Sequence, residues 1–267
     1  MTLEPGLIRA LQILSDYFKS RDYRFILIGA NVPLILIDLK EENGKGFGIR
    51  PTRDVDISVE VDSWEEYNKM KAELIDLGFI QKKDQPDHRF FLQDIMVNVL
   101  PYGESITENG FIRWPDTEQR MNVQGFDKLF KYAKPELITK GLTILVIPLP
   151  LLVFSKIIAH IDRHLTKDLL DILYVLEHYE EVSISERRFD VIGEHNLSYE
   201  ERGAYILGAD LGDLLSLQEI ETVLAFLEKF SEEYSEHVQQ LSHESGKSFE
   251  EILSLFGAFF KGLHSKR

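Results

Sequence analysis

The hydrophobic pattern of the first 60 residues alternates between helical and strand-like segments. Apolar residues at helical spacing over 6–20 predict an amphipathic helix. The continuous apolar run of residues 24–29 predicts a buried strand that ends in glycine, and the apolar residues 30–39 predict a helix after it. Within residues 50–61, apolar and polar side chains alternate from Ile57 onward, which predicts a half-buried strand.

The same alternation continues to about residue 150. A Ser-x-x-Glu capping box at Ser63 predicts a helix that closes at Gly78. Residues 79–83, 89–100 and 142–148 predict three further strands. Because helices and strands alternate in this way, we expect an α/β (α+β) fold in which helices pack against a small mixed sheet.

Helical patterns dominate from residue 151 to the end. Residues 156–174 place charged and apolar side chains on opposite faces at 100° per residue, and Thr166 is a candidate N-cap at which this helix breaks. Three capping boxes mark further helix starts at Ser198, Ser216 and Ser248. We therefore expect a mixed domain over 1–150 and a helical domain over 151–267.

Composition narrows the class of protein. The 267 residues are 44% apolar and 28% charged, which is ordinary for a globular chain. The absence of cysteine excludes disulfides, thiolate metal sites and thiol nucleophiles. The N-terminus lacks a basic signal-peptide region, and no apolar run reaches about 18 residues. We expect a cytoplasmic protein with no membrane partner.

The net charge of −15 bears on the choice of partner. A nucleic-acid surface normally carries a basic excess, so RNA or DNA would need a local basic patch working against the average field. A cationic small molecule or a protein partner meets no such obstacle.

The candidate chemistry begins with Asp54 and Asp56, two residues apart at the start of the strand predicted within 50–61. Residues i and i+2 of a strand point to the same side, roughly 7 Å apart. Two carboxylates in this position can hold Mg²⁺, which prefers a few carboxylates together with phosphate oxygens. A metal site of this kind is suited to phosphoryl transfer. The alternative is a solvated strand edge at which the acids hinder pairing with another chain.

A second candidate group lies on the polar face of residues 156–174. Lys156, Arg163 and Lys167 share that face and could bind nucleotide phosphates. The alternative is an ordinary solvated helix face. His160 and His164 at i and i+4 could bind zinc, but the sequence offers no third ligand beside them.

Together these residues resemble a known family. After the glycine-ended strand, an R-x-T-x-D-x-D pattern is formed by Arg50, Thr52, Asp54 and Asp56. A later K-x6-R-x3-K-D-x2-D pattern is formed by Lys156, Arg163, Lys167, Asp168 and Asp171. This chain resembles the polymerase-beta-like nucleotidyltransferases over residues 24–176, and within them the AbiEii/AbiGii-type toxins of type IV toxin–antitoxin systems.

The resemblance implies Mg²⁺- or Mn²⁺-dependent transfer of a nucleotidyl group from an NTP onto an acceptor. It implies that Asp54 and Asp56 hold the metal, that Lys156 contacts the triphosphate, and that Asp168 or Asp171 orients this lysine or acts on the acceptor side. The nucleotide-binding residues that it implies are Gly29, Asn31, Arg50, Thr52, Arg163 and Lys167.

Two positions depart from the family pattern. The opening motif usually has a second glycine followed by Ser or Thr, whereas this chain has Gly29, Ala30 and Asn31. The third metal carboxylate is expected on a later strand, where this chain has Asn98, a neutral amide and a poorer ligand. Asp94, on the same strand face, is about 13 Å away by strand rise and is an awkward substitute.

Three functions therefore remain open. The family resemblance implies an acceptor that is an RNA end or a protein, and a role in a toxin–antitoxin pair or in abortive infection against phage, with an antitoxin protein as partner. The acidic charge leaves open a cationic small molecule, as in antibiotic-modifying nucleotidyltransferases. Asn98 raises a third option, a catalytically silent binding module that keeps the fold and acts through its helical half.

Overall fold

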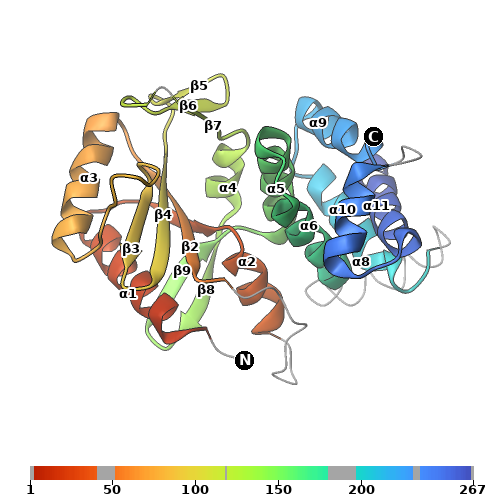
Figure 1. Ribbon diagram of the computed structural model, residues 1–267, viewed down its shortest axis with the longest axis horizontal. Helices are drawn as coiled ribbons and strands as arrows, with labels where there is room; N and C mark the ends of the chain where they lie inside the picture. Colours follow the sequence, from red (N-terminus) through yellow and green to blue (C-terminus); the bar gives the residue numbers. More distant parts are fainter. Residues whose placement is uncertain (1–2, 41–51, 118, 180–196, 231–234, 266–267) are drawn as a thin grey trace. The chain divides into compact units, whose positions relative to one another are not determined.

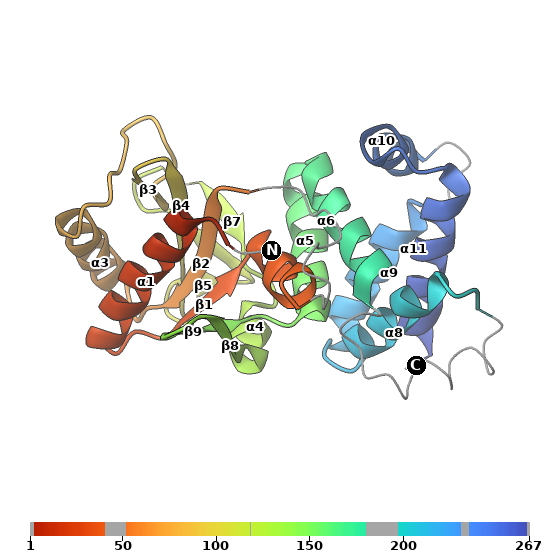
Figure 2. The same cartoon turned by 90° about the horizontal axis from the view of Figure 1, so that it is seen from below.

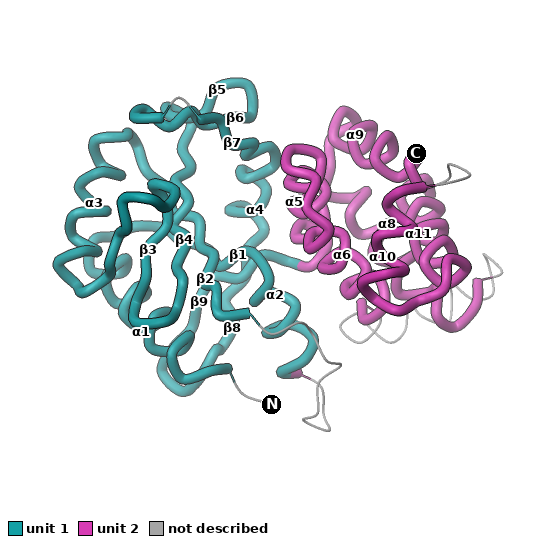
Figure 3. The backbone as a smooth tube through the Cα atoms, in the orientation of Figure 1, with its two compact units in different colours: residues 1–39, 43–148 teal, residues 40–42, 149–267 magenta. Residues whose placement is uncertain are grey.

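The computed structural model describes residues 3–40, 52–117, 119–179, 197–230 and 235–265 (Figure 1). The chain forms two compact units, one of residues 1–39 and 43–148 and the other of residues 40–42 and 149–267 (Figure 3). Each unit buries its own set of apolar side chains. The main division falls between Pro148 and Leu149, where the chain passes from the last strand into a helix.

The first unit contains a six-stranded sheet with the order β3-β4-β2-β1-β9-β8. Its strands are β1 (Phe25–Ile28), β2 (Asp54–Glu60), β3 (Arg89–Leu92), β4 (Ile95–Tyr102), β8 (Lys134–Thr139) and β9 (Leu142–Val146). Two neighbouring pairs are parallel, β2 with β4 and β1 with β9, and the other pairs are antiparallel. The predicted α/β fold with a small mixed sheet is confirmed.

Helices α1 (Pro5–Ser20) and α3 (Trp64–Asp76) pack beside each other and against the central strands (Figure 2). The Tyr17 hydroxyl of α1 donates to Glu73 Oε2 of α3 at 3.0 Å, and the Tyr67 hydroxyl of α3 donates to the Val99 carbonyl of β4 at 2.8 Å. The predicted cap is present, because the Ser63 side chain accepts a hydrogen bond from the Glu66 backbone N–H. These contacts bury the alternate apolar residues of β2 and β4 and leave the polar ones on the other face.

Two of the strand predictions were wrong in detail. Residues 79–83 form no strand and contribute a single bridge between Ile80 and Phe91. Residues 89–100 are a hairpin instead of one strand, since the chain reverses between β3 and β4 with Gln93 at φ 57°. The turn consists of Gln93 and Asp94, two polar residues between apolar runs, which were expected to belong to one continuous strand.

The other elements of the first unit are short. A separate three-stranded sheet consists of β5 (Thr107–Glu108), β6 (Phe111–Arg113) and β7 (Arg120–Asn122), and it is followed by α4 (Phe126–Tyr132). The helix predicted after β1 is present as α2 (Asn31–Pro33) and a π-helical turn over Leu34–Asp38.

The described residues of the second unit are helical. The helices are α5 (Leu149–Arg163), α6 (Thr166–His178), α8 (Glu201–Gly212), α9 (Leu217–Glu228), α10 (Glu236–Ser245) and α11 (Phe249–His264). The predicted break near Thr166 is confirmed, although Leu165 and not Thr166 is the N-cap. The capping boxes at Ser216 and Ser248 are present, whereas the helix predicted from Ser198 begins at Glu201. Among the helices described, none is long and apolar enough to cross a bilayer.

Candidate functional site

Polar side chains of the neighbouring strands β2, β4 and β3 lie in one row across the sheet of the first unit. Asp56 of β2 lies opposite Ile28 of β1 and opposite Asn98 of β4, and Asn98 in turn lies opposite Arg89 of β3. Directly opposed residues share a face of a sheet, as do residues two apart on one strand. Asp54, Asp56, Asn98 and Arg89 therefore lie on one face.

Asn98 joins Asp56 to Arg89. Its amide Nδ2 donates to Asp56 Oδ1 at 2.7 Å, and its Oδ1 accepts a hydrogen bond from Arg89 Nε at 3.0 Å. Arginine can only donate and a carboxylate can only accept, so the chemistry of the neighbours sets the orientation of this amide. Asn98 thus presents a donor to Asp56 and directs its oxygen to Arg89. Its predicted role as a metal ligand stays a prediction that requires the amide to turn over.

Gly29 touches the other oxygen of the same carboxylate. It has φ +77°, and a Cβ added there would lie 2.2 Å from Asp56 Oδ2. Only glycine permits both this backbone conformation and this approach. The Asp56 carboxylate is therefore held between the Asn98 amide on one side and the Gly29 backbone on the other.

The neighbouring predicted residues support the start of β2. The Asn31 side chain is 1% exposed, and its Nδ2 donates to the Asp54 carbonyl at 2.5 Å while its Oδ1 is buried without a hydrogen-bond partner. Thr52 Oγ1 accepts a hydrogen bond from the Asp54 backbone N–H at 3.2 Å. The nucleotide contacts predicted for Gly29, Asn31 and Thr52 stay predictions, and Arg50 lies outside the described residues.

These residues fit one hard divalent cation. Asp54 and Asp56 are both half-buried on the same face, and each ionised carboxylate oxygen can accept more than one contact. Within the described part of the chain, no three His, Cys, Asp or Glu side chains gather closely enough to hold a metal by themselves. Two carboxylates with phosphate oxygens and water are a donor set that Mg²⁺ accepts.

The second predicted cluster lies in the second unit, between α5 and α6. Lys156 Nζ is 2.6 Å from Asp171 Oδ2 and 3.5 Å from Asp168 Oδ1. Arg163 binds Asp168 through two parallel hydrogen bonds of 2.9 and 2.7 Å. Burial alone would raise the pKa of the fully buried Asp168 carboxyl, but the hydrogen bonds from Arg163 and the charge of Lys156 lower it below its ordinary value.

The charges of this cluster compensate one another. Two cations face two carboxylates, and the Lys156 side chain is only 11% exposed. Lys167, on the same helix pair, is exposed. Lys156 contacts both aspartates, and the orienting role that the resemblance implies for them stays a prediction. The phosphate contacts of Lys156, Arg163 and Lys167 and the catalytic roles of Asp168 and Asp171 stay predictions.

The two histidines weighed as a zinc pair belong to a larger aromatic group. His160 Nδ1 lies 3.1 Å from the Leu165 carbonyl, and the His160 ring centroid is 5.9 Å from that of His164 and 4.9 Å from that of His237. Burial lowers the pKa of His237 to about 4 and also lowers that of His160. His237 is far from both histidines in the sequence, and the hydrophobic pattern did not predict that it lies beside His160.

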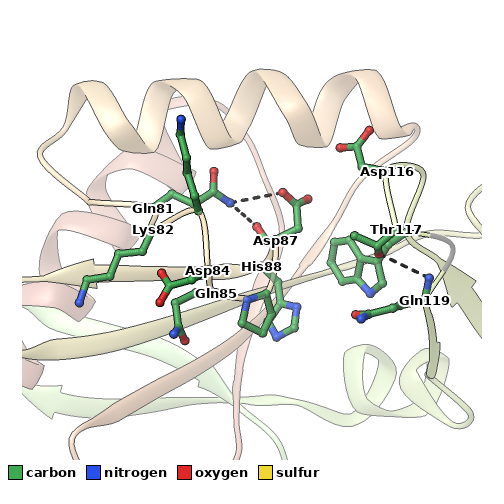
Figure 4. Close-up of a pocket in the computed structure, with 12 residues that line it drawn as sticks. Gln81, Lys82, Asp84, Gln85, Asp87, His88, Asp116, Thr117 and Gln119 are labelled. Atoms are coloured by element: carbon green, nitrogen blue, oxygen red, sulfur yellow. Dashed lines mark hydrogen bonds between the residues drawn. The ribbon is translucent and has the colours of Figure 1, made fainter.

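Arg89 is the residue of the first unit that sequence reasoning missed. Its Nη1 donates to Gln85 Oε1 at 3.0 Å, and Gln85 lines a cavity of about 500 Å³. The cavity is formed by residues 81–88 and by Trp114, Asp116, Thr117 and Gln119. Figure 4 shows Gln81 directed at Asp87 on one wall, with His88 beside it. The only signal for Arg89 in the sequence is its place at the start of the strand predicted over 89–100.

Comparison with known proteins gives distant structural likenesses. No family model matches the chain, and no curated protein matches it. The solved structure of the antibiotic-resistance factor ANT(2'')-Ia is similar at 11% identity and a TM-score of 0.38, over 64% of this chain and 82% of that one. A crystal structure of an antigenic nucleotidyltransferase-like protein from Paracoccidioides brasiliensis is similar at 16% identity and a TM-score of 0.42, over 66% of this chain and 77% of that one.

Proposed function

We propose that the protein binds an NTP together with a divalent cation and transfers the nucleotidyl group to an acceptor. The observation that carries this proposal is the pair Asp54 and Asp56 on one face of β2, with the Asp56 carboxylate fixed between Asn98 and Gly29. A carboxylate held on both sides loses little freedom when it binds a charged ligand, so the site is already organised for one.

The first unit supplies the binding and orienting groups. Asp54 and Asp56 would hold Mg²⁺ or Mn²⁺, which when bound neutralises charge on the phosphates. In the transfer, an acceptor hydroxyl or amine forms a bond to the α-phosphorus and gives up its proton to solvent. The bond from that phosphorus to the bridging oxygen breaks, and pyrophosphate leaves. Because Gly29 has no side chain, the Asp56 carboxylate has room beside the backbone. Its hydrogen bond from Asn98 keeps this carboxylate in one orientation.

By the pattern of the family that the chain resembles, residues of the second unit would contact phosphate groups. Lys167 is exposed, so it can reach a phosphate without uncovering a buried charge. Arg163 is partly exposed and would contact a phosphate while keeping its hydrogen bonds to the buried Asp168. Asp168 and Asp171 would orient Lys156 toward the triphosphate. These contacts between the nucleotide and the second unit are themselves proposed.

The acceptor follows from the resemblance to AbiEii/AbiGii-type toxins. We propose an RNA end or a protein as acceptor, with an antitoxin protein as partner, in a toxin–antitoxin or phage-defence setting. The net charge of −15 leaves open a different acceptor, a cationic small molecule such as an antibiotic. Strong salt dependence of binding would mark the RNA acceptor, because phosphate contacts release counterions.

A second candidate is a catalytically silent module that binds a nucleotide or a partner. The hydrogen bonds of Asn98 favour it, because a neutral amide and Arg89 occupy the place where a third carboxylate would add negative charge. Such a protein would bind an NTP without releasing pyrophosphate.

The test is transfer from α-³²P-labelled ATP, CTP, GTP and UTP with Mg²⁺. The acceptors are total RNA, total protein and a panel of aminoglycosides, each tested separately. We expect label on one acceptor class with matching pyrophosphate release, and none with Asp54→Asn/Asp56→Asn. Asp94→Asn is the matched control, since it makes the same change on an exposed carboxylate of the same unit that pairs with Arg53. Equal labelling by the double variant would refute the proposal, and NTP binding without pyrophosphate would favour the silent module.

A further inference from the structure

Arg89 is a cation fixed in position and linked to the Asp56 carboxylate through the Asn98 side chain. Two hydrogen bonds of 3.0 Å hold its guanidinium, one from Nε to Asn98 and one from Nη1 to Gln85. A third bond of 2.7 Å then joins Asn98 to Asp56. Arginine remains charged at any pH that the fold tolerates, so this positive charge is permanent.

We propose that Arg89 takes the place of one divalent cation at this strand end, so that the site on Asp54 and Asp56 binds a single ion. The inference rests on the proposed function in one respect, that Asp54 and Asp56 bind a cation. It makes Arg89 a positioning residue, because it acts on Asp56 through Asn98.

The charges of the row explain why a single ion suffices. Phosphoryl-transfer sites that hold two ions usually present several carboxylates to both of them. Here the position opposite Asp56 carries a neutral amide whose donor faces Asp56, and the next position carries a positive charge. A second cation placed between Asp56 and Asn98 would meet the N–H groups of the amide and the charge of Arg89 behind them.

Distance sets the size of the effect. Two hydrogen bonds and the width of an amide place the guanidinium on the order of 7 Å from the Asp56 carboxylate. A unit charge at that distance repels a divalent ion in a water-like dielectric enough to weaken binding about fivefold to tenfold. The matched lysine keeps the charge but lacks the paired donors that hold the guanidinium.

The experiment uses Mn²⁺ alone, without nucleotide, on the full chain. The free ion is counted by electron paramagnetic resonance during a titration. We expect one Mn²⁺ per wild-type chain and none for Asp54→Asn/Asp56→Asn. Circular dichroism confirms that each variant is folded.

Variants of the row give the expected differences. Arg89→Gln should tighten Mn²⁺ binding about fivefold to tenfold, whereas Arg89→Lys should stay within about twofold of wild type. Asn98→Asp adds a carboxylate that Arg89 can still hold, so it should tighten binding at least about tenfold while the number of bound ions stays at one. The control is Asn122→Asp, the same change on β7, where the Asn122 oxygen accepts a hydrogen bond from the Gln124 backbone N–H. It should leave binding unchanged.

Three results would overturn the inference. They are two bound ions in wild type, an unchanged affinity in Arg89→Gln, or an equal gain from Asn122→Asp and Asn98→Asp. If one Mn²⁺ binds and depends on Asp54 and Asp56 while Arg89→Gln has no effect, the inference fails and the proposed function stands. If wild type binds no Mn²⁺, the inference and the metal-dependent function fail together.

Discussion

Asp56 and Asp168, one from each of the two predicted motifs, lie in opposite surroundings. Asp168 is fully buried and lies within 3.5 Å of the cationic groups of Lys156 and Arg163. Asp56 is half-buried and is held by a neutral amide and a glycine backbone, with Arg89 one residue further along the row. The charge of the Asp168 carboxylate is compensated by cations of its own unit. The Asp56 carboxylate is instead held in place by neutral groups.

This difference predicts that Asp168 matters mainly for the stability of the fold and Asp56 mainly for the binding of a ligand. A buried ion pair is costly to break because removal of one partner leaves an unmatched charge out of water. Substitution of a half-exposed carboxylate changes the stability of the fold little, but it removes the charge that attracts a cation. We therefore expect substitutions in the helix pair of the second unit to act mainly on folding, and substitutions at the strand end to act mainly on binding.

The largest effect should come from Lys156→Met. It leaves Asp171 without its contact at 2.6 Å and removes one of the cations beside Asp168. The expected loss in the free energy of unfolding is about 3–5 kcal/mol, measured by urea denaturation at pH 7. Lys167→Met, an exposed lysine of the same helix pair, is the control and should change it by less than about 0.5 kcal/mol. Equal effects of the two substitutions would contradict the contrast drawn between the units.

The next effect should come from Gly29→Ala. The new Cβ would lie 2.2 Å from Asp56 Oδ2, so the carboxylate must move, and Mg²⁺-dependent NTP binding should weaken at least about tenfold. Gly141→Ala is the control for backbone strain, because Gly141 has φ +88° and an added Cβ would meet nothing within 4 Å. If both variants lost stability equally and neither lost binding, Gly29 would be a turn residue only.

A smaller effect should appear in the acid stability of the second unit. Burial lowers the pKa of His237 to about 4 from its ordinary 6.5. Between these values the unfolded chain binds more protons than the folded one, so this contribution is present above pH 6.5 and is lost as the pH falls toward 4. We expect His237→Gln to remove about 1 kcal/mol of the pH dependence over that window, as measured by urea denaturation at several pH values. An unchanged slope would show that the ring is solvated.

The smallest effect should come from Asp94→Asn. Asp94 and Arg53 form an ion pair at 3.0 Å with both side chains more than 60% exposed. Such pairs contribute less than about 1 kcal/mol, so the free energy of unfolding should change by about 0.5 kcal/mol or less. NTP binding, followed by calorimetry, should not change. A loss of Mg²⁺-dependent binding would instead place Asp94 among the metal ligands.

The predictable parts of the molecule were those set by neighbours in the sequence. The caps at Ser63 and Ser216 depend on residues three apart, and the common face of Asp54 and Asp56 depends on residues two apart. Local rules of this kind also predicted the mixed sheet and the helical second half.

The missed parts depend on contacts between distant segments. The pairing of Arg89 with Asn98 requires the hairpin turn at Gln93, where one continuous strand was expected. The proximity of His237 to His160 requires α10 to pack near the end of α5. The compensation of Lys156 by two aspartates follows from the chain reversal between α5 and α6, and periodicity along a single helix cannot show it.

The most direct test of the central claim is the binding of NTPs by isothermal titration calorimetry, with and without Mg²⁺. We predict that the wild-type protein binds at least one NTP only when Mg²⁺ is present. We also predict that Asp54→Asn/Asp56→Asn abolishes this binding while circular dichroism stays unchanged. Binding that survives in the double variant, or the absence of any NTP binding by wild type, would contradict the assignment of the strand end as the nucleotide and metal site.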